Sequence, residues 1–194
     1  GATPTLSFAT PGLVPGTSHF QLLAWIGTGT LTLATPVMAH DEMVVESQGA
    51  SIIASSNGSR MTVSDLFAVG PLAFNNVPLT LSTTTNGALS LANITFQNMP
   101  TTVSQLTVSH PGGSFTFTNL VFNTTPVAPN GFYLDVTDNT GPTDGGLIID
   151  MENPTPATPG AFVQTNGGAV VNWPSGTVAV RLWNGAVSTN WSAA

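Results

Sequence analysis

The sequence contains no cysteine, and this absence removes several classes of fold and chemistry. Without thiols there is no disulfide scaffold, no thiol catalysis and no zinc site with cysteine ligands. Long apolar segments are also missing. The longest unbroken apolar run in the N-terminal part, Leu22–Ile26, is far shorter than the roughly 20 residues that a membrane-spanning helix needs. We therefore expect no membrane span.

Charged residues are nearly as scarce as cysteine. They make up 6% of the chain, against roughly 25% in an ordinary soluble domain. There is no lysine, and Arg60 and Arg181 stand against nine acidic residues, which gives a formal net charge of −7. A chain with so few cations has no basic surface for phosphate groups, so we expect neither nucleic acid nor an anionic membrane as a partner.

The residues that are abundant indicate an all-β fold. Threonine and valine occur throughout, 20 glycines and 15 prolines supply turns, and no segment has the pattern of an amphipathic helix. With 194 residues the chain is long enough for one domain with a substantial core. Residues 1–17 contain three prolines and are predicted to form an extended N-terminal arm, and residues 18–194 a single all-β domain.

A change of phase interrupts the strand pattern in residues 86–98. Leu89 and Leu91 alternate as they would on the buried face of a strand, but after Asn93 the apolar side chains resume in the opposite phase, at Ile94. Asparagine tolerates the left-handed conformation that a one-residue corner often needs. This stretch is therefore predicted to form two short strands hinged at Asn93.

The same pattern recurs along the middle of the chain. Residues 112–124 repeat it around Asn119, and residues 57–69 repeat it less regularly around Asp65. We predict that the three copies are structurally equivalent, because they share the phase change and each opens on a turn signal. Their spacing lies in the range of solenoid repeats.

Two all-β architectures fit this plan. In a right-handed parallel β-helix, or β-solenoid, each repeat is one coil, and Asn93 and Asn119 stack at the same corner. In an antiparallel β-sandwich or jelly roll, each Asn-Gly is a tight hairpin turn and the phase change is a bulge. We favour the β-solenoid, since coils explain both the period and the corner.

Three strings of residues resemble known surface proteins. LSLANITFQN and FTFTNLVFN, within residues 57–124, resemble the coils of secreted bacterial right-handed β-helix proteins. The tail LWNGAVSTNWSAA is similar to a tryptophan-rich string of autotransporter-like surface proteins. The resemblance implies a repeat module at the cell surface or outside the cell, with an adhesive or structural role.

Catalytic chemistry is hard to assemble from this sequence, and we expect no enzyme and no catalytic residue. Asp150 and Glu152 share one face of the strand LIIDME, as a glycosidase pair would, but the simpler interpretation is a solvated outer face. His19, His40 and His110 are scattered without a ligand spacing. The string His40-Asp41-Glu42 could touch a metal, but it is more typical of an exposed polar turn.

The turn DVTDNTGPTDGG at 135–146 is the best metal candidate. Calcium prefers several hard oxygen ligands on a flexible loop, and this turn supplies them from Asp135, Asp138, Asn139 and Asp144. The alternative is that aspartate and asparagine serve here as ordinary turn formers. Calcium is the one cofactor that the sequence suggests.

Two function classes remain, and the first is structural. A nearly uncharged surface lacks the repulsion that keeps sheet proteins apart, and the alternating Leu6 and Phe8 of the arm could add a strand to a neighbouring subunit. This predicts an extracellular, self-assembling surface or filament subunit, a homo-oligomer or polymer.

The second class is binding. Trp173, Trp183 and Trp191 could stack on sugar rings, which would make the chain an adhesin or a carbohydrate-binding module of a larger surface protein, with glycans as partners. The competing interpretation is that these tryptophans belong to the core and to the ends of the domain.

Overall fold

A computed structural model describes residues 5–6, 16–26, 28–46, 49–82, 87–109, 112–127, 129–137, 147–156, 163–166, 169–174 and 176–177. In these ranges the regular elements are all strands, and no helix occurs. Accordingly, this part of the chain has no helix of the length and apolarity needed to cross a membrane.

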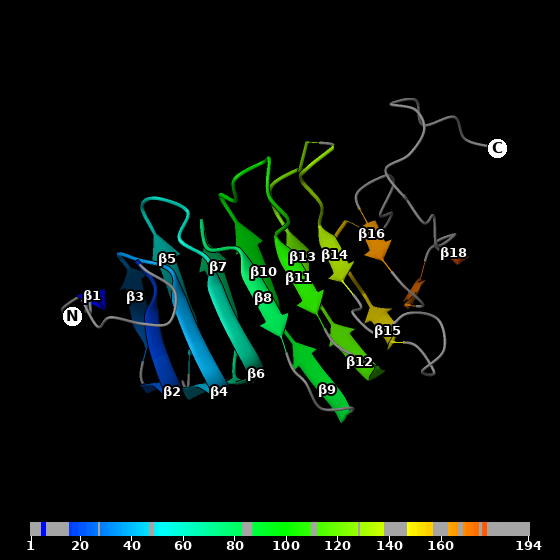
Figure 1. Cartoon of the computed structure of the whole chain (residues 1–194). Coiled ribbons are helices and arrows are strands. Elements are labelled where there is room, and N and C mark those ends of the chain that lie inside the picture. Colours follow the sequence, from blue (N-terminus) through cyan, green and yellow to red (C-terminus); the bar gives the residue numbers. More distant parts are fainter. Residues whose placement is uncertain are drawn as a thin grey trace.

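The strands form three sheets that run along one stack of coils (Figure 1). Sheet A contains β1 (Thr5–Leu6), β3 (Gly29–Leu33), β5 (Ser51–Ser55), β7 (Leu72–Asn75), β10 (Ile94–Gln97) and β13 (Val121–Phe122). Sheet B contains β2 (Ser18–Ile26), β4 (Val37–Glu46), β6 (Met61–Val69), β8 (Leu79–Ser82), β11 (Leu106–Ser109), β14 (Leu134–Thr137) and β16 (Val163–Asn166). Sheet C contains β9 (Gly87–Ala92), β12 (Gly113–Thr118), β15 (Leu147–Glu152), β17 (Val170–Trp173) and β18 (Gly176–Thr177).

Neighbouring strands are parallel in all three sheets, with β17 and β18 as the one antiparallel pair among the described strands. A hairpin sandwich would give antiparallel neighbours. The β-solenoid prediction is therefore confirmed. Coil length varies, because paired residues are separated by 18 positions between Met61 and Leu79 and by 34 positions between Phe117 and Met151.

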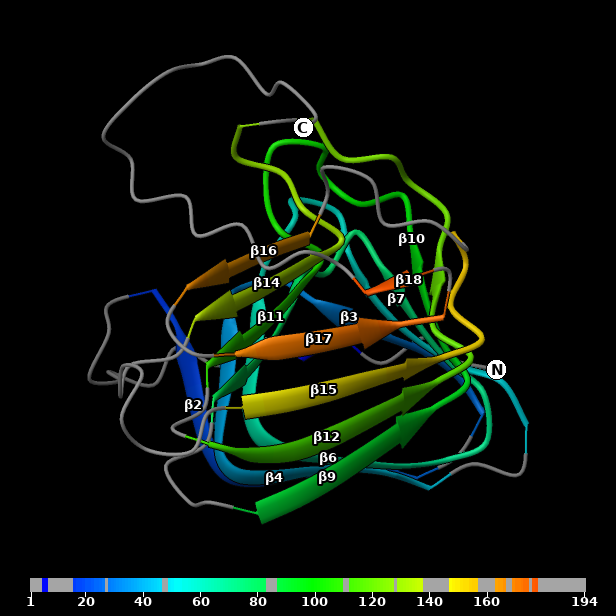
Figure 2. The same ribbon diagram turned by 90° about the vertical axis from the view of Figure 1, so that its right-hand side faces the viewer.

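The first three coils differ from the later ones. Their strands β2, β4 and β6 are nine or ten residues long, and β6 continues beyond Met61–Val63, the part that pairs with β8. Figure 2 shows β4 and β6 turning to run alongside β9. In the next coil, two separate strands take the place of one long strand: β8 in sheet B and β9 in sheet C. The long strands bend at an irregularity in the ladder, where His40 and Asp41 of β4 lie opposite Ser64 of β6.

Left-handed asparagines form the corner between sheets C and A. Asn93, Asn119 and Asn153 have φ angles of 58°, 56° and 49°, and each directly follows a sheet C strand. The Nδ2 of Asn119 donates to the Oδ1 of Asn93 over 3.1 Å. The predicted corner and its stacking are confirmed for Asn93 and Asn119, and Asn153 is a third member that sequence reasoning missed.

The copy around Asp65 is not equivalent to the other two. Asp65 lies inside β6 at the bend between the sheet B and sheet C directions, and it is not among the residues with positive φ. Its carboxylate accepts a hydrogen bond from the main-chain N–H of Leu66. The phase change at Asp65 is real, because Val63 and Leu66 are both buried, but it marks a different corner of the coil.

A second asparagine corner joins sheets A and B. Asn76 and Asn98 have φ angles of 56° and 52° and follow β7 and β10, two paired strands. The sequence carried a signal for this corner, since both asparagines come two residues after a buried phenylalanine, in FNN and FQN.

Inward side chains of successive coils stack into a continuous apolar core. Phe74, Phe96 and Phe122 from β7, β10 and β13 form one such stack, with ring centroids 5.6 and 5.3 Å apart. On sheet C, Phe115 and Phe117 of β12 are buried between the paired residues of β9 and β15. Because alternate residues of each strand enter this core, the others face outwards, and this alternation positions the polar side chains of sheet C that are described below.

Candidate functional site

The strongest candidate site lies on the outer face of sheet C, towards its C-terminal end. In β15 the alternation buries Leu147, Ile149 and Met151 and turns Asp150 and Glu152 outwards, as the sequence predicted. The parallel register places Asn172 of β17 directly beside Asp150, and Thr118 of β12 beside Glu152.

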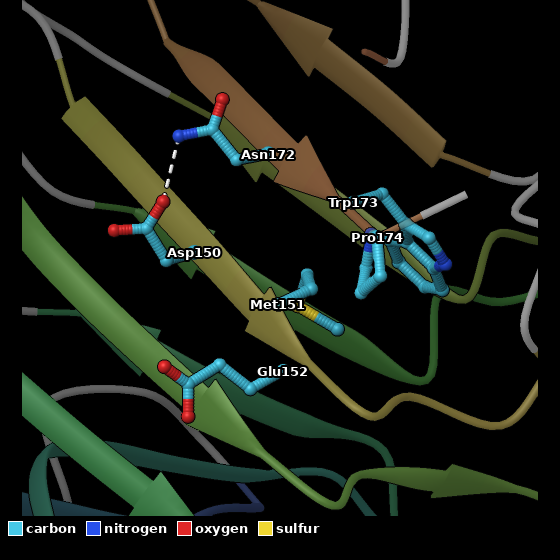
Figure 3. A pocket seen from close by; sticks show the side chains of 6 residues that line it. All are labelled: Asp150, Met151, Glu152, Asn172, Trp173 and Pro174. Carbon is cyan, nitrogen blue, oxygen red and sulfur yellow. Dashed lines mark hydrogen bonds between the residues drawn. The ribbon is translucent and has the colours of Figure 1, made fainter. Parts of the chain in front are cut away.

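Both carboxylates are held by neighbouring strands. The Nδ2 of Asn172 donates to Oδ1 of Asp150 over 2.6 Å, and the hydroxyl of Thr118 donates to Oε2 of Glu152 over 2.9 Å. Figure 3 shows the two carboxylates on the same side of β15, with the Asn172 amide reaching Asp150. Each carboxylate uses one oxygen in these bonds, so its other oxygen remains a potential acceptor for a ligand.

A hollow of about 330 Å³ borders these groups. It is lined by residues of β15 and β17 and by Pro174, which follows β17. The full lining is Asp150, Met151, Glu152, Asn172, Trp173 and Pro174. Asp150, Glu152 and Asn172 reach this hollow from the outer face and Pro174 is its exposed apolar residue, whereas Met151 and Trp173 are each only 3% exposed. Polar groups that can accept and donate hydrogen bonds beside an apolar residue suit a hydroxyl-rich molecule. The residues that sequence reasoning missed are Asn172 and Thr118, because a period of two predicts that they face outwards but not which carboxylate they meet.

The structure describes one of the three tryptophans that were predicted to bind sugars. Trp173 has an exposed fraction of 3% and packs in the core, so its ring offers little surface for stacking in this structure. It nevertheless contributes to the wall of the hollow. Trp183 and Trp191 lie outside the described residues.

The structure corrects the placement of one predicted calcium ligand. Asp135 is a residue of strand β14, facing out from sheet B between buried Leu134 and Val136, and does not belong to the turn. The other three predicted ligands, Asp138, Asn139 and Asp144, lie outside the described residues. Calcium binding by the turn stays a prediction, and among the described residues no three histidine, aspartate or glutamate side chains gather as metal ligands.

Asp135 belongs instead to a polar cluster on sheet B. The hydroxyl of Ser104 donates to its Oδ2 over 3.0 Å, and the guanidinium of Arg60 donates to the hydroxyls of Thr80 and Thr107 over 2.8 and 3.4 Å. Thr80, Thr107 and Asp135 occupy one rung across β8, β11 and β14. Arg60 therefore links strands of several coils.

Burial dominates the electrostatics of this cluster. It raises the pKa of the Asp135 carboxyl, while the hydrogen bond from Ser104 and the positive charge of Arg60 act in the opposite direction. Burial likewise lowers the pKa of the Arg60 guanidinium, an effect that the charge of Asp135 opposes. For both groups, the effect of burial on the pKa thus outweighs the effect of the opposite charge.

The N-terminal arm is described only at Thr5–Leu6. These two residues form β1, which pairs in parallel with Thr32 and Leu33 of β3 in the same chain and is the first strand of sheet A. Phe8 lies outside the described residues. Addition of the arm to a neighbouring subunit stays a prediction.

Comparison with protein-family models, with curated proteins and with solved structures finds no match to this chain.

Proposed function

We propose that this protein is a non-catalytic binding module for a neutral polysaccharide, with its site on the outer face of sheet C. The observation that carries the proposal is the hollow beside β15 and β17, which two carboxylates and an amide line from the outer face together with the exposed Pro174. Sugar hydroxyls donate to carboxylates and accept from amides, so this combination suits them.

The ligand is expected to be uncharged. The hollow has two carboxylates and no basic residue in its lining, and the whole chain has a formal net charge of −7. An acidic polysaccharide would bring further negative charge to this surface, at a cost in binding free energy. This separates the proposal from enzymes that cleave acidic polysaccharides, which require basic residues.

The module is proposed to be non-catalytic for a structural reason. A glycosidase acid is held protonated by apolar surroundings, while its partner remains ionised. Glu152 is exposed, Asp150 is half-buried, and each accepts a hydrogen bond from a polar neighbour. Neither carboxyl therefore lies in the enclosed apolar surroundings of a glycosidase acid. An extracellular or cell-surface location is part of this proposal, and rests on the resemblance of the coils to secreted β-helix proteins.

The proposal is tested by affinity electrophoresis of the parent through gels that contain a neutral xylan, a neutral β-glucan or the acidic polymer pectate. We expect retardation by at least one neutral polysaccharide and none by pectate. Asp150→Ala and Asn172→Ala should each weaken binding about tenfold or more, equivalent to about 1.4 kcal/mol.

The matched control is Glu46→Ala, which removes an exposed carboxylate from the outer face of β4, away from the hollow, and should bind like the parent. The proposal fails if no neutral polysaccharide retards the parent, or if the Asp150 and Asn172 variants migrate as the parent does. Release of reducing sugar from a bound polysaccharide would contradict the non-catalytic part.

A second candidate function, an assembling structural subunit, is favoured by a different surface. Large apolar side chains are exposed on the outer faces of β2 and β6, among them Ile26 at 73%, Leu22 at 54% and Phe67 at 51%. Val44 of β4 pairs with Ala24 of β2 and with Phe67 of β6, so apolar residues occur on this face across three strands, with Glu42 and Glu46 among them. Exposed apolar surface is typical of an association face. Sedimentation velocity over a range of concentrations decides this candidate. The double variant Ile26→Thr/Phe67→Thr should associate less than the parent does. A parent that is monomeric at every concentration excludes this function.

A further inference from the structure

Two histidines that are 21 residues apart in the sequence come together on the outer surface of the first two coils. His19 belongs to β2 and His40 to β4, which are adjacent parallel strands. Their rings are stacked, with centroids 5.2 Å apart and an interplanar angle of 17°. Nδ1 of His19 and Nε2 of His40 are 3.0 Å apart, in a hydrogen bond between the two rings.

The backbone irregularity of β4 helps to produce this arrangement. The ladder between β2 and β4 shifts register after Phe20, and His40 lies in the segment of β4 that is skipped. The hydroxyl of Ser64 on the next strand donates to the main-chain oxygen of His40, which fixes the backbone at this position. The ring of His40 is exposed, so it can turn about its own side-chain bonds without disturbing the core.

The two rings lie close enough for both to bind one metal ion. With the facing nitrogens 3.0 Å apart and the ring centroids 5.2 Å apart, each nitrogen points almost directly at the other, so a metal ion binds both when the exposed ring of His40 turns away from this hydrogen bond. Imidazole nitrogens are typical ligands of Cu²⁺ and Ni²⁺ in square-planar or tetragonal sites.

We propose that His19 and His40 form a surface binding site for Cu²⁺, with Nδ1 of His19 and Nε2 of His40 as its two protein ligands. Both rings bind as neutral imidazoles. The ring that now donates the hydrogen bond moves its proton to its other nitrogen, so that both facing nitrogens present lone pairs. Water completes the coordination, because no three histidine, aspartate or glutamate side chains come together in the described part of the chain.

The site has a structural consequence as well. A metal held by one ligand from β2 and one from β4 connects the first two coils, so it stabilises the folded chain over the unfolded one. Copper is favoured over nickel and zinc because the affinity of a given nitrogen site rises to a maximum at Cu²⁺ in the first-row series.

The test is a calorimetric titration of the full chain with CuCl2, followed by electron paramagnetic resonance of the complex. We expect one Cu²⁺ per chain, a signal with hyperfine splitting from two imidazole nitrogens, and a melting temperature that rises with copper. His19→Gln and His40→Gln should each weaken Cu²⁺ binding at least tenfold and lose one of the two nitrogens. ZnCl2 should bind at least tenfold more weakly than CuCl2.

His110→Gln is the matched control, since it removes the third histidine of the chain and should leave the titration unchanged. Circular dichroism of every variant without metal checks that the fold is retained, and His19→Asn and His40→Asn replace any glutamine variant that fails this check. The proposal is overturned if the His19 and His40 variants bind Cu²⁺ as tightly as the parent. It is also overturned if the parent's signal does not show two imidazole nitrogens.

Discussion

Single asparagines determine where the chain turns from one sheet to the next. At Asn93 the left-handed backbone, with φ at 58°, coincides with a hydrogen bond from the Asn119 amide to the Asn93 side-chain oxygen. The main-chain N–H of Asn93 also donates to the oxygen of Thr118 in the following coil. The side chain therefore stabilises an unusual backbone conformation and links two coils at the same time.

The first prediction tests this corner. Asn93→Val should lower the free energy of unfolding by about 1 to 3 kcal/mol, because a β-branched residue is strained in the left-handed region. Asn93→Gly keeps that conformation accessible and loses only the amide, so it should cost less, about 1 kcal/mol. Denaturant unfolding of the three proteins measures the difference. If the valine variant is as stable as the parent, the corner does not depend on this residue.

Asp135 allows a prediction about pH. Its pKa is raised in the folded chain from the ordinary value of 3.8, so the folded state holds this proton more tightly than the unfolded state does. The stabilising contribution of the protonated carboxyl is complete below pH 3.8 and is lost as the pH rises through the folded pKa. The free energy of unfolding of the parent, relative to that of Asp135→Asn, should therefore fall as the pH rises from 3.8 through the folded pKa.

Urea unfolding at several pH values checks this sign. Ser104→Ala offers a matched variant, because it removes a hydrogen bond that favours the ionised carboxylate and should extend the loss of stability to higher pH. A parent that gains stability over Asp135→Asn as the pH rises would show that attraction by Arg60 outweighs burial.

Among the elements, the short strands of sheet A depend on side-chain stacking between coils. β7, β10 and β13 have only two to four residues each, yet each places one phenylalanine in the same column of the core. Phe96 occupies the middle of this column, with its ring nearly parallel to those of Phe74 and Phe122. Strands this short gain most of their stability from such contacts rather than from their few ladder hydrogen bonds.

The third prediction concerns this column. Phe96→Ala should lower the free energy of unfolding by about 3 to 5 kcal/mol, because it opens a cavity and removes both ring contacts. Phe96→Leu fills part of the space and should cost less. Val127→Ala, at an exposed position, is the control and should stay within about 0.5 kcal/mol of the parent. A Phe96→Ala variant as stable as this control would mean that the column contributes little to stability.

For the whole molecule, the ends of the coil stack matter most, because a parallel sheet presents unpaired backbone groups at its edges. At the N-terminal end, β1 pairs with β3 and so occupies this edge of sheet A. Two residues supply little stability of their own, but they satisfy part of the backbone of β3.

The fourth prediction follows from this placement. Deletion of residues 1–12 removes β1, and we expect self-association to increase while the main melting transition changes little, because the edge of β3 becomes available to another chain. Sedimentation velocity at several concentrations measures the association, and a deletion of residues 1–4, which retains β1, is the control. If the chain that lacks residues 1–12 associates less than the parent, the arm connects subunits instead of covering the edge of its own sheet.

The sequence by itself determined the all-β class and the orientation of most side chains, and it favoured a β-solenoid over a sandwich. Alternation of period two showed that Asp150 and Glu152 face outwards, and the phase changes identified the corners at Asn93 and Asn119. These features are local, because whether a residue in a strand points in or out depends only on its immediate neighbours.

Only the tertiary structure decided which residues meet across coils. Asn172 lies beside Asp150 and His19 beside His40 because parallel strands pair residues about 20 positions apart, over connections of unequal length. The prediction that the copy around Asp65 is equivalent to the copy around Asn93 was wrong, because similar local patterns occur at two different corners of the coil. Local alternation does not record coil length, and it is coil length that selects the neighbours and hence the candidate sites.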